Sequence, residues 1–392
     1  MMRDSSIRAR RSYESILVVL APLSSVGTVV IALSWLTGHA EIAWRTIVVQ
    51  ASIVAAIPQG AAFIAAAMRL LCRERWIAIR RAAEAISLAL PVAFVAQLAL
   101  AIGSGVLAAP GSVTWRLAHL AASLALDGVG CAFVVASLSG VTARALDVGE
   151  AEGWLAEHLA ALWPRGERYV APLAFAYLAL YTMGSPFLVH TAAGPLRVSV
   201  DSWMRAPFLA LDDVVIAFAV VLVAARVARY GDARATLMLT PTARQALPAL
   251  AVSSGLLGVV WLAQFCAALP HSPIRDAGLL PLVVAWRGWY SLALFALMFA
   301  HVTPAFLAAP SSASDPQSHL DAACAALLVG SLAERAVVLL PSVAPSFGLV
   351  DLFACLVGVS VTGICMVAAL GIASVDDDSL ATGRTSHSSL AR

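Results

Sequence analysis

Charged side chains stand inside segments of this sequence that are otherwise continuously apolar. They are Asp127 in LALDGVG, Asp212 and Asp213 in FLALDDVVIAF, and Glu334 with Arg335 in SLAERAVVLL. An ionised group near the middle of a membrane helix costs about 2.5–3.5 kcal/mol on insertion scales, so such a group needs compensation or a function. These five residues are therefore the first candidates for chemistry.

Three further polar residues complete the candidate set, namely Arg287 in AWRGWY, Gln264 and His190. A quinol headgroup needs an acceptor for its leaving proton, a donor for its other oxygen and an apolar slot for its tail. The eight side chains together predict a quinol site or a proton pathway. Structural pairing is the alternative, because the adjacent Glu334 and Arg335 point to different helix faces and each needs its own partner.

Histidine and cysteine raise the question of a bound redox centre. His119 and His190 fall near one side of the predicted membrane region and His301 and His319 near the other, as a two-haem cytochrome would require. All four lie at predicted helix ends, where interfacial histidine is common, so we expect no haem. The six cysteines form no CxxC pair, so we expect no iron–sulfur cluster and no metal site in this chain.

Composition indicates the elements that must position these residues. Of the 392 residues 61% are hydrophobic and only 12% are charged, which no water-soluble fold of this length could accommodate. The apolar runs are about twenty residues long and continuous, whereas a β-barrel would alternate polar and apolar residues. The sequence predicts an all-α polytopic membrane protein whose surroundings are the lipid bilayer; nucleic acid is not an expected partner.

Hydropathy predicts about ten transmembrane helices, each long enough to cross a bilayer. Their expected ranges are 15–36, 46–70, 83–108, 117–142, 169–190, 206–229, 246–269, 278–303, 320–341 and 349–374. The transmembrane domain thus covers 15–374, between a tail at 1–14 and a disordered tail at 375–392. The segment 150–168, EAEGWLAEHLAALWPRGER, predicts either an interfacial helix anchored by tryptophans or a plain connecting helix.

Arginine placement predicts the orientation of these spans. Most arginines fall in the N-terminal tail, in the segments after the second, fourth and sixth spans, and in the C-terminal tail. The positive-inside rule then places both termini in the cytoplasm of a multi-pass protein of a bacterial inner membrane. In that orientation the candidate residues lie mostly in the outer half of the bilayer.

Three segments resemble a known family when they are taken in order along the chain. Residues 75–91, RWIAIRRAAEAISLALP, resemble a junction with the pattern A-x-W … R-R-x-x-E … P. Residues 199–207, SVDSWMRAP, resemble D-W-x-M-S-L-x-P, although Arg205 and Ala206 depart from it. The third segment spans 259–310. The matching residues are Trp76, Arg80, Arg81, Glu84, Pro91, Asp201, Trp203, Met204, Pro207, Trp261, Gln264, Pro270, Arg287, Gly288, Trp289, Pro304 and Phe306.

These patterns are similar to those of NrfD-like (polysulfide reductase C-like) membrane subunits of alternative complex III, a bacterial quinol:electron-acceptor oxidoreductase. The likeness is to the second large subunit, the ActF-like one. It implies two four-helix bundles, about 46–190 and 206–341, and a quinol (menaquinol or ubiquinol) site or proton route. It also implies that the redox cofactors sit in partners: a homologous NrfD-like subunit, an iron–sulfur/molybdopterin-like subunit and multihaem cytochrome c subunits.

Two other functions are compatible with the same residues. A secondary transporter would use buried charges in a bundle of this size, with interrupted helices near the middle of the membrane. A structural subunit of a membrane complex would use the charges only to pair helices. Whether the chain is itself an enzyme stays open at this point, because it shows no redox centre of its own.

Overall fold

The computed structural model describes residues 29, 32, 33, 35–71, 76–107, 113–147, 154–193, 205–227, 233–268, 292, 294–307 and 316–339. Within these ranges the chain is helical and contains no strand, which confirms the all-α class for the described part. Most of 15–36, most of 278–293, all of 349–374 and both tails lie outside the described residues. The count of ten spans therefore stays a prediction.

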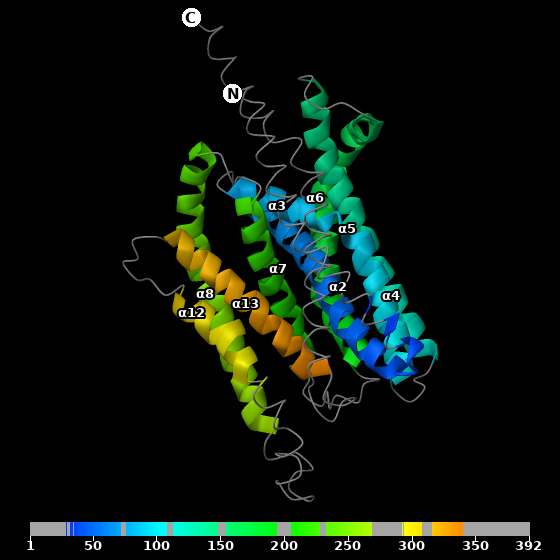
Figure 1. Ribbon diagram of the computed structural model, residues 1–392. Coiled ribbons are helices and arrows are strands. Elements are labelled where there is room, and N and C mark those ends of the chain that lie inside the picture. Colours follow the sequence, from blue (N-terminus) through cyan, green and yellow to red (C-terminus); the bar gives the residue numbers. More distant parts are fainter. Residues whose placement is uncertain are drawn as a thin grey trace, which may run out of the picture.

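The helices fall into two groups with one helix between them (Figure 1). The first group contains α2 (Ala40–Leu71), α3 (Ile77–Ser87), α4 (Leu90–Leu107), α5 (Val113–Asp147) and α6 (Trp154–Ala193). The second contains α8 (Ala233–Ala268), the π-helix η3 (Leu297–Val302), α12 (Thr303–Leu307) and α13 (Pro316–Leu339). Helix α7 (Arg205–Val227) packs against α2 and α6 on one side and α8 and α13 on the other.

In the part of the chain that the structure describes, five helices are long and apolar enough to cross a membrane, and a bent pair of helices would make a sixth. The five segments are Ile47–Leu71, Arg116–Ser139, Arg168–Leu188, Pro207–Ala225 and Ala246–Ala263. Each overlaps a span expected from the sequence. Helix α13, which carries the ionic pair of the ninth expected span, is not among the five.

The third expected span is broken rather than continuous. Helix α3 ends at Ser87, α4 begins at Leu90, and the two axes differ by 52°. Pro91 explains the break, because a proline lacks an N–H and its ring collides with the carbonyl four residues earlier, which is that of Ser87. The amides of Leu88 and Ala89 turn to Ala85 and Ile86, at 3.1 and 3.0 Å.

The segment 150–168 does not form a separate helix. From Trp154 it runs into the following span as the single helix α6. This agrees with a connecting helix better than with a separate interfacial one.

Small residues let the helices approach closely where polar groups are buried. A Cβ on Gly60 of α2 would lie 2.6 Å from the Cβ of Ala217 and 2.8 Å from the carbonyl oxygen of Asp213, both on α7. A Cβ on Gly330 of α13 would collide with the backbone of Phe299 and Ala300 in η3. Without a hydrophobic drive between helices in lipid, such contacts between small residues are what holds a membrane bundle together.

Candidate functional site

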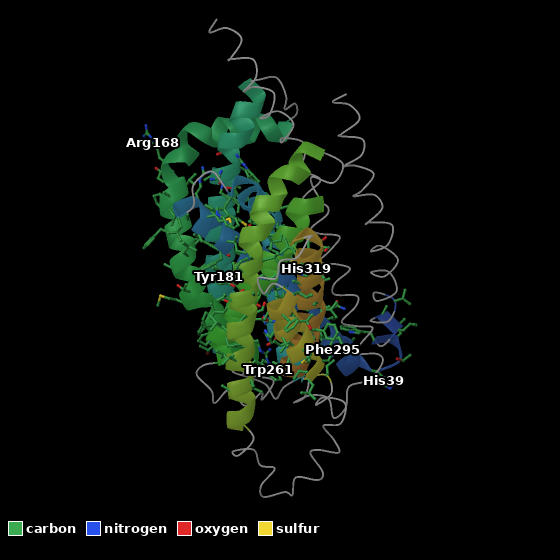
Figure 2. The ribbon with its side chains drawn as sticks, turned by 90° about the vertical axis from the view of Figure 1, so that its left-hand side faces the viewer. His39, Arg168, Tyr181, Trp261, Phe295 and His319 are labelled. Atoms are coloured by element: carbon green, nitrogen blue, oxygen red, sulfur yellow. The ribbon has the colours of Figure 1, made fainter. Side chains whose placement is uncertain are left out.

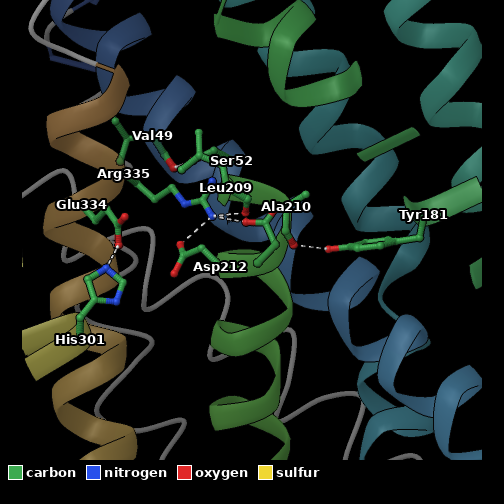
Figure 3. A network of polar contacts seen from close by, with 10 residues as sticks. Val49, Ser52, Tyr181, Leu209, Ala210, Asp212, His301, Glu334 and Arg335 are labelled. Atoms are coloured by element: carbon green, nitrogen blue, oxygen red, sulfur yellow. Dashed lines mark hydrogen bonds and ion pairs between the residues drawn. The ribbon is translucent and has the colours of Figure 1, made fainter. Parts of the chain in front are cut away.

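A buried charged centre joins α7 and α13 (Figure 3). Arg335 Nη2 donates to Asp212 Oδ2 at 3.0 Å, to the carbonyl oxygen of Leu209 at 3.3 Å, and to Asp213 Oδ1. All three ionic side chains are buried. Arginine suits this place because its planar guanidinium can reach several oxygens at once. We call Arg335, Asp212, Asp213, Glu334 and His301 the charged centre.

Glu334 faces away from the guanidinium of its neighbour. Successive helical residues are about 100° apart, so Glu334 points from α13 towards η3 rather than α7. There its Oε2 lies 3.2 Å from His301 Nε2 (Figure 3). Both side chains are buried, at 0% and 2% exposure. The two adjacent residues of α13 thus have separate partners on separate helices.

The formal charges of the charged centre do not cancel. Two carboxylates contact Arg335 and a third contacts His301, so a protonated His301 would still leave one negative charge among the described residues of the centre. A net charge away from water is so costly that the group takes up a proton or a counter-ion instead. Among the described residues the centre thus has one acid in excess, which a proton, a cation or a further basic side chain would balance.

A second polar cluster lies between α2 and α5. Gln59 Nε2 donates to Asp127 Oδ1 at 2.8 Å, and Ser123 Oγ donates to Asp127 Oδ2 at 3.1 Å. Tyr177 Oη donates to the carbonyl oxygen of Gln59 at 2.9 Å. All four side chains are buried. The described donors to the Asp127 carboxylate are both neutral. Asp212 and Asp213 differ, because they accept hydrogen bonds from the charged Arg335.

Helix α6 connects the two polar regions. Tyr177 contacts α2 beside Asp127, and Tyr181, one turn later, donates from Oη to the carbonyl oxygen of Ala210 on α7 at 3.2 Å. Their ring centroids are 6.2 Å apart. Figure 2 shows Tyr181 in the interior while Arg168 of the same helix projects outward. Helix α6 thus holds the backbone of Gln59 on α2 and that of Ala210 on α7.

Two further buried polar groups lie in the first group of helices. Glu84 accepts from Ser137 Oγ at 2.7 Å and lies 3.4 Å from Arg81 Nη1 and 3.6 Å from Arg80 Nε. This network ties α3 to α5. Elsewhere Gln97 Oε1 and His119 Nε2 are 3.1 Å apart, which ties α4 to α5.

The structure brings four of the eight candidates together, namely Asp212, Asp213, Glu334 and Arg335. Asp127 is buried but belongs to the separate cluster on the other side of α2. Gln264 and His190 belong to α8 and α6, but their side chains lie outside the described part. Arg287 lies outside the described residues altogether.

The three described histidines of the haem hypothesis all have protein contacts. His119 contacts Gln97, His301 contacts Glu334, and His319 Nδ1 lies 3.1 Å from the carbonyl oxygen of Leu307. The roles of His301 and Gln59 in the acidic clusters were missed by the sequence analysis. A signal for Gln59 existed, since an amide in the middle of an apolar span needs a partner just as an acid does.

No protein-family model matches this sequence, and a search of curated proteins finds no significant match.

Proposed function

We propose that this chain is a multi-pass membrane subunit of a bacterial quinol-oxidising respiratory complex, in which the charged centre takes up protons released from quinol. The observation that carries the proposal is the excess of buried acid in the charged centre, where three carboxyl groups have one arginine and one histidine as their described partners. An NrfD-like subunit of alternative complex III is the family that its motifs resemble. Both termini would lie in the cytoplasm, as the arginine distribution predicts.

The reaction divides between this chain and its partners. Oxidation of a quinol releases two electrons and two protons. The electrons would pass to haem or iron–sulfur groups of the partner subunits that the resemblance implies. The protons need bases close to the membrane interior, and Asp212, Asp213 and Glu334 supply them. Arg335 would stabilise the ionised state of the aspartates between transfers.

Isosteric variants of the acids test this function. Asp213→Asn and Glu334→Gln keep the shape of the side chain but cannot accept a proton in the same way. We expect each to lower quinol-dependent electron transfer by about a hundredfold, the typical contribution of one acid–base group. The measurement is quinol oxidation by the intact complex in native membranes.

Asp321→Asn is the matched control, because it removes a carboxylate from the same helix, α13, away from the charged centre. This variant should retain wild-type turnover. Wild-type turnover in both Asp213→Asn and Glu334→Gln, with the complex assembled, would contradict the proposal. Co-purification of a multihaem cytochrome and an iron–sulfur subunit would support it independently.

A secondary transporter is the second candidate, and the broken helix pair α3–α4 favours it. Interrupted helices at membrane depth are typical of transporters, where the break exposes backbone groups to a substrate. Solute or cation flux into proteoliposomes that contain this chain alone would support a transporter. A quinol-complex subunit would show no such flux without its partners.

A further inference from the structure

Buried polar atoms without partners gather where α8, η3 and α13 meet. They are the hydroxyls of Ser254 and Ser331, both ring nitrogens of His301 and both carboxylate oxygens of Glu334. Within the described ranges none of these atoms makes a hydrogen bond of good geometry, although His301 and Glu334 form the 3.2 Å contact. Buried polar atoms are almost always satisfied in proteins, so a group of them at one place indicates a missing occupant.

Helix packing brings these atoms to one level of the bundle. A Cβ on Gly258 of α8 would lie 2.8 Å from the Cβ of His301, and Ser254 is one turn away from Gly258. The backbone of Ser254 also approaches the imidazole of His301. On α13, Ser331 follows Gly330, which abuts Ala300, and Glu334 lies one turn further.

The backbone at this place is unusual as well. Residues Leu297–Val302 form a π-helix that contains His301. A π-helical turn is rare, and it is frequently found at functional sites. From this π-helix the ring of His301 reaches the carboxylate of Glu334 (Figure 3).

The charges around the junction select a positive occupant. From α7, Asp212 and Asp213 lie nearby, and α13 contributes Arg335 besides Glu334. The α8 residues that pack on His301 are Ser254 and Gly258, and neither is ionisable. The described ionisable groups around the junction are therefore net negative, which favours a proton with water over an anion.

We propose that this junction is a hydrated proton-binding site, in which ordered water bridges Ser254 and Ser331 to one proton shared by Glu334 Oε2 and His301 Nε2. The proton arrives from an aqueous phase or a neighbouring carboxyl group and leaves the same way, and no electron is transferred. Buried water typically makes about three hydrogen bonds, and the unpartnered atoms supply that number. The inference rests on the proposed function and deepens it, because it identifies the η3 side of the charged centre as the place where Glu334 holds its proton.

The test is an infrared titration of the full-length chain in lipid nanodiscs, without quinol or partner subunits. We expect a protonated-carboxyl band that appears as the pH falls, shifts in D₂O and is absent from Glu334→Gln. Ser254→Ala and Ser331→Ala should move its midpoint by about half a pH unit or more, because each removes a partner of the bridging water. Bands of bound water that shift in H₂¹⁸O should accompany the titration in the wild type, so the test does not depend on the Glu334 variant folding.

Ser253→Ala is the matched control. Ser253 neighbours Ser254 on α8, but its hydroxyl already donates to the carbonyl oxygen of Leu250 at 3.1 Å. This variant should leave the midpoint unchanged. Unchanged midpoints in Ser254→Ala and Ser331→Ala, or a band that persists in Glu334→Gln, would overturn the proposal. A midpoint that moves when choline replaces sodium would show a metal cation instead, which would also overturn it.

The result of the infrared titration does not depend on the result of the quinol-oxidation test. Loss of the proton site would leave the electron-transfer test of Asp213→Asn unaffected, whereas wild-type turnover in that variant would leave the infrared titration standing.

Discussion

At the residue scale, one guanidinium controls whether the acids of α7 can be buried at all. Arg335 is 4% exposed. Among the described residues, it is the cation that contacts Asp212 and Asp213. Removal of one member of a buried ion pair leaves an uncompensated charge, which costs more than the pair itself contributes. Arg335 is therefore expected to be more important for stability than either aspartate.

The corresponding prediction concerns Arg335→Leu. This variant should lower the free energy of unfolding by about 3–5 kcal/mol, since two carboxyl groups lose their charged partner. The measurement is denaturant unfolding of the purified chain in detergent micelles. Arg168→Leu, an exposed arginine on α6, is the control and should change stability little (Figure 2).

Substitution of both aspartates in the Arg335→Leu variant tests why that variant loses stability. Asp212→Asn and Asp213→Asn, added to Arg335→Leu, should restore much of the lost stability, because neutral amides need no counter-charge. A triple variant as unstable as Arg335→Leu alone would show that the arginine stabilises the bundle through something other than these two acids.

At the element scale, the contact between α2 and α7 brings the two polar regions close together. Gln59, which binds Asp127, is followed by Gly60, which touches the backbone of Asp213. The small side chain of Ala217 completes this approach from α7. A larger residue at position 60 would push α2 away from α7. The displacement would occur beside Gln59 of one polar region and Asp213 of the other.

Gly60→Ala is therefore expected to be destabilising. The added Cβ would lie 2.8 Å from a backbone oxygen and 2.6 Å from another Cβ, so α2 and α7 must move apart. Overpacking of this kind costs about 1–3 kcal/mol. Gly128→Ala is the control, because nothing lies within 4 Å of its added Cβ, and helix propensity alone should make it neutral or stabilising. Thermal unfolding of both variants decides the comparison, and equal stability would contradict the close contact.

The break between α3 and α4 shows how one residue changes an element. Hydropathy alone predicts a single span over 83–108, since the apolar residues of α4 continue back into the end of α3. The proline ring at Pro91 interrupts the backbone hydrogen bonds and the two pieces diverge by 52°. The Glu84 network at the end of α3 then anchors the shorter piece to α5.

At the scale of the whole molecule, the orientation in the membrane remains to be measured. The arginine distribution predicts that the connection around residue 150 is cytoplasmic and that the connection around residue 198 is external. Fusions to a fluorescent reporter active only in the cytoplasm should glow after residue 150 and stay dark after residue 198. Alkaline phosphatase fusions should give the reverse pattern. Both fusions on one side would mean that α6 does not cross the membrane.

Composition and periodicity by themselves determined that this protein is helical and suited to lipid, because continuous apolar runs leave the backbone no other way to satisfy its hydrogen bonds. They also identified Asp127, Asp212, Asp213, Glu334 and Arg335 as residues that need partners, since the cost of burying charge is a property of the residue type.

Only the tertiary structure decided which partner each residue has. Arg335 could have paired with any of the buried acids, and packing of α13 on α7 selects Asp212 and Asp213. Glu334 meets His301 because the π-helix η3 packs on α13, and Asp127 meets Gln59 because α2 packs on α5. Sequence spacing specifies the face of a helix, whereas the neighbour on that face depends on how close glycine and alanine let the helices approach.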